Sequence, residues 1–419
     1  MRSSRHRISI IVAVAVGGGA AALAPAADDN KPAAPPRLQL PRTGQIRFER
    51  RDLVKNRNEG IAVADVNKDA IPDLTAGPFW FEGPAFKSHP LRDIALELND
   101  EFMANNGEHA FDLNGDGWLD VIAGSWFGDK IWWFENPGSA GLAAGRKWKE
   151  HVLSTGKTET EGLLFEDLDG DGVPELVPDS WVDDKPVAVI RVTPGRNGGE
   201  PRFTEVKISD GPNGHGMGIG DVNRDGRPDV VVQHGWYEAP EGDLWGKKWT
   251  FHRFEKGLGH TGLPILVVDV NGDGKNDLVY GQGHDFGLFW NEQIPGDGPE
   301  YRWKRHLIDD SFSQVHTLAW TDLDGDGNME ILTGKRFRAH GDGDPGAHEP
   351  VCLLRFEWDP AAGKFARDVI SFNDGISTGM QIRVADLDGD KRPDVAVAGK
   401  SGGYVLLNRG PAKRENAAR

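Results

Sequence analysis

Cysteine is almost absent from this sequence. Its 419 residues include a single cysteine, Cys352, so the chain cannot form an internal disulfide. A stable fold must therefore be closed in another way. Basic residues are also few, 48 against 65 acidic residues, and the formal net charge of −17 argues against a function in binding nucleic-acid phosphates.

Motifs of several protein classes are missing as well. No G-x-S-x-G sequence supplies a hydrolase nucleophile, and no glycine-rich nucleotide loop follows a strand and opens a helix. Beyond the amino terminus, no apolar run is long enough to cross a membrane, so we expect no membrane insertion once the amino-terminal segment is removed.

The amino-terminal segment has the composition of a secretory signal peptide. Three arginines precede a short apolar run over residues 8–16, and small residues follow up to position 27. The run is short for an uncleaved membrane anchor. We therefore expect a cleaved signal over residues 1–27, a Pro/Ala-rich linker over residues 28–43, and a protein that is secreted or periplasmic.

A nine-residue acidic motif, D-[LV]-[DN]-x-D-(G)-x-x-[DE], occurs seven times. Its copies, named acidic loops 1 to 7, are "DVNKDAIPD" (65–73), "DLNGDGWLD" (112–120), "DLDGDGVPE" (167–175), "DVNRDGRPD" (221–229), "DVNGDGKND" (269–277), "DLDGDGNME" (322–330) and "DLDGDKRPD" (386–394). A short apolar stretch precedes each loop, and further apolar and aromatic stretches follow it. Four strands per unit at this spacing are typical of a β-propeller blade.

The predicted fold class is therefore all-β: a seven-bladed β-propeller over residues 44–410 with four antiparallel strands per blade, followed by a tail over residues 411–419. The seventh unit contains only three strands, and "IRFERRDLV" (46–54) resembles the missing fourth. We expect this amino-terminal strand to complete the last blade. The ring would then be closed without a disulfide, and the edges of the terminal blades would be buried.

The acidic loops suit a hard cation, because they present side-chain oxygens at positions 1, 3, 5 and 9 of a tight turn. Loops 2 to 6 are the stronger candidates, since loop 1 lacks the glycine and loop 7 has Lys391 in its place. The alternative is that these side chains only cap their own turns. The predicted Ca²⁺ ligands are Asp112, Asn114, Asp116, Asp120, Asp167, Asp169, Asp171, Glu175, Asp221, Asn223, Asp225, Asp229, Asp269, Asn271, Asp273, Asp277, Asp322, Asp324, Asp326 and Glu330.

Histidines gather where the first strand of a unit begins. The residue six places before each loop should enter the innermost strand, near the axis and on the face away from the acidic loops. His215 and His316 occupy this position, and His260 lies close to it in the unit between them. Three imidazoles from adjacent blades could hold Zn²⁺ with one position open. The alternative is a set of polar side chains that line the channel.

Other histidines divide between the two ends of a blade. Connections between second and third strands should emerge on the face of His215, and one of them carries His284. By contrast, His151, His252 and His306 recur as W-x-x-H in outer strands and are predicted to be structural.

The acidic loops resemble those of integrin-type FG-GAP and VCBS propellers, over roughly residues 46–409. The segment 303–350, with "DDSFSQVHT" and "GKRFRAH", resembles the propeller domain of the aldos-2-ulose dehydratases. This resemblance implies a catalytic zinc that acts as a Lewis acid in dehydrating a keto-sugar. It extends best to His316, Lys335, Arg336 and His340, whereas the cupin and lectin-like domains of the fungal enzyme have no matching segment here.

The resulting hypothesis is a carbon–oxygen lyase, a hydro-lyase that performs a zinc-assisted β-elimination on a small carbohydrate. Arg336 could stabilise the enolate, and Trp80, Trp126, Trp181 and Trp236 could stack on sugar rings or pack in blade cores. The alternative is a non-catalytic, calcium-stabilised propeller that binds glycans or proteins. The sequence does not define the sugar or the oligomeric state. The candidate base is Glu161, with Glu59 and His109 as alternatives, and the candidate proton donors are His340 and His284.

Overall fold

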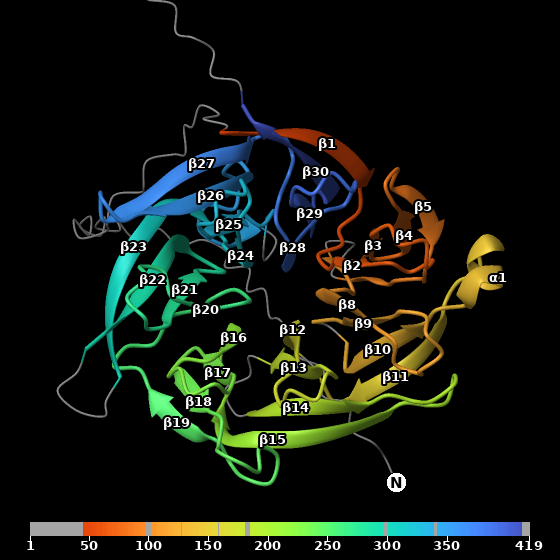
Figure 1. Cartoon of the computed structure of the whole chain (residues 1–419), viewed down its shortest axis with the longest axis horizontal. Coiled ribbons are helices and arrows are strands. Elements are labelled where there is room, and N and C mark those ends of the chain that lie inside the picture. Colours follow the sequence, from red (N-terminus) through yellow and green to blue (C-terminus); the bar gives the residue numbers. More distant parts are fainter. Residues whose placement is uncertain are drawn as a thin grey trace, which may run out of the picture. The chain divides into compact units, whose positions relative to one another are not determined.

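The computed structural model describes residues 45–97, 102–126, 128–157, 159–180, 185–295, 301–338 and 342–412. The predicted signal peptide and linker, Trp181, His340 and most of the predicted tail lie outside these residues. The described residues form seven four-stranded antiparallel sheets, arranged as blades around a common axis (Figure 1). The predicted all-β, seven-bladed propeller is confirmed.

Within each blade the strands follow one another in chain order from the axis outward, apart from the last blade. Blade 1 contains β2 (Ala62–Ala64), β3 (Asp73–Ala76), β4 (Phe79–Glu82) and β5 (Lys87–Pro90); blade 2 contains β8 (Gly107–Phe111), β9 (Asp120–Gly124), β10 (Lys130–Glu135) and β11 (Lys149–Thr155). Blade 3 contains β12 (Thr160–Glu166), β13 (Glu175–Ser180), β14 (Pro186–Thr193) and β15 (Arg202–Pro212); blade 4 contains β16 (Met217–Gly220), β17 (Asp229–Val232), β18 (Gly235–Glu238) and β19 (Thr250–Arg253). Blade 5 contains β20 (Leu266–Val268), β21 (Asp277–Gly281), β22 (Phe286–Ile294) and β23 (Arg302–Ser313); blade 6 contains β24 (Leu318–Thr321), β25 (Glu330–Gly334), β26 (Cys352–Asp359) and β27 (Lys364–Phe372).

Blade 7 joins the two ends of the described chain. Its strands β28 (Gln381–Ala385), β29 (Asp394–Gly399) and β30 (Gly402–Pro411) are completed by β1 (Ile46–Val54), which pairs antiparallel with β30 from Ile46↔Pro411 to Val54↔Gly403. This is the predicted closure by the amino-terminal strand. Because Cys352 is buried and free, hydrogen bonds rather than a disulfide hold the ring shut.

The acidic loops connect the first strand of each blade to the second, and their fourth and sixth residues turn through the left-handed region. Gly115 and Gly117 have φ values of 69° and 86°, and the pattern recurs in the other loops. Glycine adopts this region without strain, which explains why it dominates both positions. In loop 7, Lys391 accepts φ 68° where the other loops mostly have glycine.

The hydrophobic core lies between blades rather than inside them. Each of the seven clusters of buried apolar side chains joins two neighbouring blades, as Val66 and Trp80 of blade 1 join Phe134 of blade 2. Trp80 and Trp236 are 3% and 0% exposed, so they pack in these cores and are not available to stack on a sugar. A core of this kind gives each blade a fixed position relative to the next.

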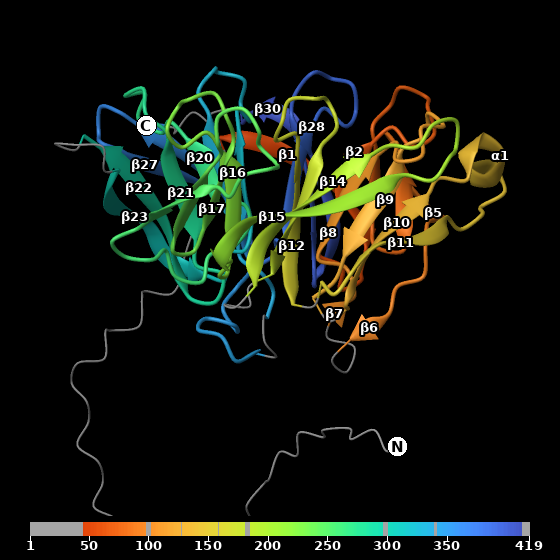
Figure 2. The ribbon, with the colours of Figure 1, turned by 90° about the horizontal axis from the view of Figure 1, so that it is seen from below.

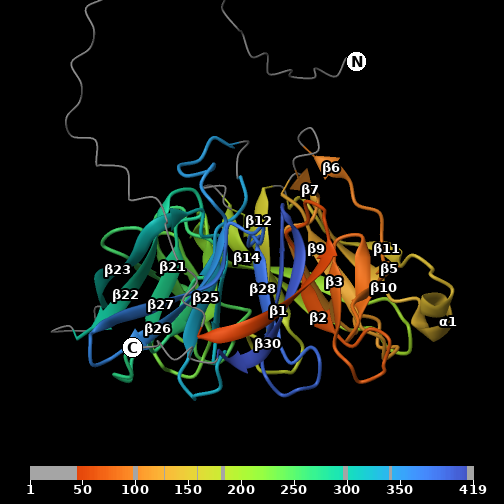
Figure 3. The same cartoon turned by 90° about the horizontal axis from the view of Figure 1, so that it is seen from above.

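The face opposite the acidic loops carries the starts of the first strands and the connections between second and third strands, and is called the histidine face. A two-stranded hairpin, β6 (Leu96–Glu97) and β7 (Phe102–Met103), projects on this side, as Figures 2 and 3 show. One short helix, α1 (Gly138–Ala143), follows β10 at the periphery. Among the described residues, no helix has the length and apolar character needed to cross a membrane.

Candidate functional site

Four side chains that could bind a metal converge on the histidine face. They are Glu161 in β12, His215 before β16, His284 between β21 and β22, and His316 before β24. One ligand atom from each lies within 4.8 Å of the others. Blades 3, 4, 5 and 6 each contribute one residue, so the group forms only when these four consecutive blades pack side by side.

The two imidazoles of His215 and His284 face each other through Nε2 atoms 2.8 Å apart. The Nδ1 atom of His215 is 2.7 Å from the carbonyl oxygen of Thr261, and Nδ1 of His284 is 2.9 Å from Oδ2 of Asp344. Both of these partners only accept hydrogen bonds, so each Nδ1 must carry the proton. In the neutral rings, both Nε2 atoms therefore present lone pairs to one another, an arrangement that needs a cation or an extra proton between them.

The third imidazole, His316, is fully buried. Burial, together with the positive charge of Arg336, holds the pKa of His316 well below its ordinary value. The ring is thus neutral, and its Nε2 accepts a hydrogen bond from Nη1 of Arg336 at 2.9 Å. Oε1 of Glu161 lies 3.5 Å from the same Nε2 atom. Nε2 of His316 and Oε1 of Glu161 therefore lie beside the position between the histidines, and a metal on this Nε2 would take the place of its hydrogen bond from Arg336.

Arg336 is fixed by a second carboxylate. Its Nε and Nη2 donate to the two oxygens of Glu59 at 2.7 and 2.6 Å, and both side chains are almost fully buried. Burial alone would raise the pKa of Glu59, but Arg336 lowers it below its ordinary value. A bidentate pair of this kind leaves Nη1 as the part of the guanidinium that reaches His316 and Glu161.

These residues fit a divalent transition metal. Three imidazoles and a carboxylate are the donors that zinc prefers, and Zn–N bonds are about 2.0–2.1 Å, so nitrogens sharing one ion lie within roughly 4 Å of each other. His215 and His284 meet this condition at 2.8 Å. Their Nδ1 partners are of the kind that orient metal-binding histidines, a backbone carbonyl and a carboxylate.

The grouping differs from the predicted one in a single member. His284 joins His215 and His316, whereas His260 is exposed and stacks on His215 with ring centroids 5.4 Å apart. The physical reason is the local path of the chain. Gly259, just before His260, turns with φ 89°, and the carbonyl oxygen of Thr261, just after it, accepts the hydrogen bond from Nδ1 of His215. The sequence carried a signal for His284, since it lies in a second-to-third strand connection on this face.

The other candidate catalytic residues lie in different surroundings. Glu59 is committed to Arg336, as described above. His109 is directed away from the group: its Nε2 is 2.9 Å from the carbonyl oxygen of Leu163, and its ring packs against Phe165. Burial and the nearby Arg383 lower the pKa of His109 to about 3. His340 is outside the described residues.

Two residues of the site were not found from the sequence. Asp344, the partner of His284, lies in a long connection whose path the sequence does not define. Asp179 is fully buried in β13, where its Oδ2 accepts a hydrogen bond from the Gly216 amide at 3.0 Å. Burial and the nearby Glu161 raise the pKa of Asp179 well above its ordinary value. A strand that is buried at every position, as β13 is, contains no alternation that would mark such a carboxyl group.

The acidic loops, on the other face, are held by hydrogen bonds to their own backbone. In loop 2, Asp112 accepts from the amides of Gly115 and Gly117 at 2.8 Å each. The ninth residue joins the loop to the blade: both oxygens of Asp120 accept amide protons, from Leu113 at 3.0 Å and from Asn136 at 2.9 Å. Burial raises the pKa of Asp120 to about 7. These contacts are the turn capping that the alternative interpretation described.

Carboxylate oxygens also cluster in three of the loops. They lie within 4.8 Å of one another in loop 6 (Asp322, Asp324, Asp326, Glu330), loop 3 (Asp167, Asp169, Glu175) and loop 7 (Asp386, Asp388, Asp394). In loop 6, Oε1 of the buried Glu330 has no hydrogen-bond partner among the described residues. Loop 7, which the sequence ranked among the weaker candidates, thus has the same arrangement of carboxylates as loops 3 and 6.

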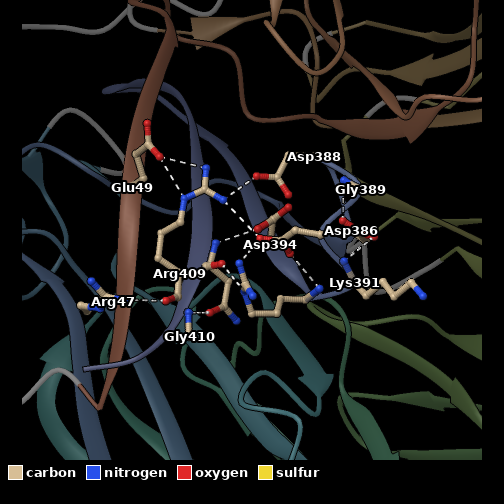
Figure 4. Close-up of polar contacts among 12 residues, drawn as sticks. Arg47, Glu49, Asp386, Asp388, Gly389, Lys391, Asp394, Arg409 and Gly410 are labelled. Carbon is tan, nitrogen blue, oxygen red and sulfur yellow. Dashed lines mark hydrogen bonds and ion pairs between the residues drawn. The ribbon is translucent and has the colours of Figure 1, made fainter. Parts of the chain in front are cut away.

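Each of these three loops has an arginine next to its third residue. Asp169 is paired with Arg191 at 3.4 Å, Asp324 with Arg355 at 2.6 Å, and Asp388 with Arg409 at 2.5 Å. Figure 4 shows Arg409 lying between Asp388 and Glu49 of β1, so this contact also ties the closing strand to the loop. The extra carboxylate is therefore partly neutralised by the protein itself.

Comparisons with known proteins address the repeats and the fold. A family model described as FG-GAP-like repeat matches residues 112–177 and 269–333, and both matches begin at the first aspartate of an acidic loop. No curated protein matches the chain, so the dehydratase resemblance stays a prediction. Two crystal structures of BBS1N in complex with ARL6DN, soaked with mercury or with lead, are similar to it at 11% and 10% identity, each with a TM-score of 0.49. They cover 85% and 86% of this chain, and 94% and 96% of their own. The chain is thus a seven-bladed β-propeller that carries FG-GAP-like repeats.

Proposed function

We propose that this protein is an exported, metal-dependent carbon–oxygen lyase that performs a β-elimination on a keto-sugar or related carbohydrate. The observation that carries the proposal is the buried group on the histidine face. Three histidines and Glu161 meet there, and one ligand atom from each lies within 4.8 Å of the others. His215, His284 and His316 would hold the ion, and zinc is the metal that best suits these donors.

A bound zinc ion would supply Lewis acidity, which polarises a substrate carbonyl and acidifies the adjacent C–H bond. In this proposal Glu161 takes that proton, because its Oε1 lies beside the histidine nitrogens and its side chain is 5% exposed. Nη1 of Arg336 donates a hydrogen bond to the developing enolate oxygen. The C–O bond at the β carbon then breaks, and the proton taken by Glu161 passes to the leaving oxygen, which departs as water or as a sugar alcohol.

Metal content and turnover test the two roles separately. Purified protein should contain about one zinc per chain, and enone absorbance should appear when keto-sugars are supplied. Changing His215 and His284 to Ala should remove the zinc and the activity, whereas Glu161→Gln should keep the zinc and lose the activity. As a matched control, His252→Ala in blade 4 removes an outer-strand histidine that stacks on Trp236, and it should leave the zinc content unchanged.

Other outcomes would lead to different conclusions. Loss of zinc in Glu161→Gln would make Glu161 a ligand rather than the base. A protein that holds calcium but no transition metal, and is inactive on every keto-sugar supplied, would overturn the lyase and favour a non-catalytic propeller that binds glycans or proteins.

We also propose that Ca²⁺ binds in some of the acidic loops and stabilises the blades. Loop 6 has the strongest support, because it combines four clustered carboxylates with the unpartnered Oε1 of Glu330. Calcium takes six to eight oxygen ligands, and carboxylates are the usual ones.

A further inference from the structure

We propose that Arg383, near the axis of the ring, binds a small and weakly hydrated inorganic anion such as chloride. Arg383 lies in β28, the innermost strand of blade 7 (Figure 1). It is the only lysine or arginine in the seven innermost strands, all of which belong to the described residues. The inference goes beyond the proposed lyase and does not depend on it.

The guanidinium group of Arg383 reaches two neighbouring blades. Its Nε donates to the carbonyl oxygen of Ile61, just before β2 of blade 1, at 2.9 Å. Its Nη2 donates to the carbonyl oxygen of Glu108, in β8 of blade 2, at 3.0 Å. A side chain that extends from blade 7 past blade 1 to blade 2 lies on the axial side of these innermost strands. The two carbonyl groups hold the guanidinium in a fixed orientation.

This guanidinium has donors to spare and no paired carboxylate. A guanidinium carries five N–H groups, of which the two carbonyl oxygens use two. No ion pair to Arg383 forms within the described part of the chain; Glu166 and Glu108 act on it only at longer range. The carboxylate of Glu108 instead accepts from Nη2 of Arg92 at 2.6 Å, and Glu166 is exposed at the end of β12.

The surroundings of Arg383 favour a counter-ion that sheds its water easily. Burial lowers the pKa of Arg383 to about 10, although Glu166 and Glu108 act in the opposite direction. The nearby His109 is held neutral, and its ring packs against Phe165. A charge that is removed from water without a partner is costly, and a weakly hydrated anion offsets it at the smallest desolvation cost. Because Arg383 is half-buried rather than sealed, solvent and small ions reach it.

Thermal unfolding at constant ionic strength tests this inference, with sodium bromide replacing sodium methanesulfonate. Bromide has the charge of chloride and is weakly hydrated, whereas methanesulfonate has the same charge and is larger. We expect the Tm of the wild type to rise along a saturating curve, by about 1–3 °C at ten times the dissociation constant. General salt effects do not produce such a curve, because stabilisation by exclusion from the protein surface belongs to strongly hydrated ions.

Two variants locate the effect. Arg383→Met removes the guanidinium and should abolish the rise in Tm. The matched control is Arg367→Met in β27, which removes an arginine whose Nη1 is already paired with Asp309 at 2.6 Å. This control should show the same rise as the wild type. The anion site is refuted if the wild type shows no saturating rise, if Arg383→Met keeps it, or if Arg367→Met loses it as well.

A second measurement covers the case in which Arg383→Met does not fold. Crystals of the wild type soaked in bromide should show an anomalous-difference peak in contact with Nη1 of Arg383, and a map without this peak refutes the site. His215→Ala/His284→Ala should lose the metal yet keep the bromide-dependent rise in Tm. Failure of the lyase proposal therefore leaves the anion site standing, and failure of the anion site leaves the lyase proposal untouched.

Discussion

Asp344 provides the sharpest test of the histidine site, because it touches the proposed metal only through His284. Its Oδ2 is 2.9 Å from Nδ1 of His284, and the two side chains are 11% and 14% exposed. The carboxylate keeps the proton on Nδ1 and the lone pair on Nε2, where the metal would bind. Partners of this kind are worth about 10- to 100-fold in metal affinity, which corresponds to roughly 1.4–2.7 kcal/mol.

We therefore expect Asp344→Ala to weaken zinc binding by about 10- to 100-fold, and Asp344→Asn to weaken it less because an amide oxygen still accepts a hydrogen bond from Nδ1 of His284. Competition against a chromophoric chelator measures the affinity, and the absorption spectrum of the Co²⁺ form reports a change in ligand geometry. The free energy of unfolding of the metal-free protein should fall by only about 1 kcal/mol, the value of one such hydrogen bond.

Asp342→Asn is the matched control, since Asp342 is in the same connection and pairs with Arg338 and with His348, a histidine outside the proposed metal group. It should leave zinc affinity unchanged. The reasoning is refuted if Asp344→Ala binds zinc within twofold of the wild type while His215→Ala/His284→Ala abolishes binding. That result would mean that His284 does not need its carboxylate to present Nε2.

Three further predictions concern stability. Glu59→Gln leaves the buried Arg336 without its bidentate carboxylate and should lower the free energy of unfolding, measured by denaturant titration, by about 3–5 kcal/mol. The double variant Glu59→Gln/Arg336→Met should recover much of this loss. Equal stability of Glu59→Gln and the wild type would contradict the buried ion pair. Calcium at 100 times its dissociation constant should stabilise the protein by about 2.7 kcal/mol. Asp322→Asn/Asp326→Asn in loop 6 should reduce the calcium-induced rise in Tm. The matched change Asp65→Asn/Asp69→Asn should reduce it less, because loop 1 forms no such carboxylate group among the described residues. The pKa of His109 is lowered to about 3, so the neutral imidazole stabilises the fold fully above pH 6.5, and this contribution is lost as the pH falls toward 3. Between pH 7.5 and 5, the free energy of unfolding of the wild type should fall by about 2 kcal/mol more than that of His109→Gln. Identical pH profiles of the two proteins would show that the imidazole is not held neutral.

The sequence predicted what repeats locally. Glycine at the fourth and sixth positions of an acidic loop indicates a positive φ angle, and aspartates at alternate positions indicate a tight turn. Both features can therefore be predicted from a stretch of nine residues. The spacing of these loops then defines the blades. The missing fourth strand of the last unit was enough to predict that β1 closes the ring, because an unpaired edge must be covered.

The sequence was less informative where a contact joins different blades. His215 and His316 were placed near the axis by their position in the repeat, but His284 and Asp344 come from connections of unequal length, which follow no period. The displacement of His260 depends on a single left-handed glycine. The path of such a connection is decided by packing and hydrogen bonds across blades, and these leave no mark on local periodicity.

The acidic loops differ at their third position, and an aspartate there is paired with an arginine that comes from a different place in each blade. Four loops have asparagine at the third position, and their blades carry a glutamate at the end of the third strand that bonds a histidine of the fourth strand: Glu82 with His89, Glu135 with His151, Glu238 with His252, and Glu292 with His306. The other three loops have aspartate there, and each has an arginine instead. These arginines do not share one place in the repeat, because Arg191 of β14 lies opposite Thr204 of β15, whereas Arg409 lies near the end of β30. The three arginines thus reach the third-position aspartate from different places in the repeat, which fits the physical requirement that an added carboxylate be balanced by a nearby cation.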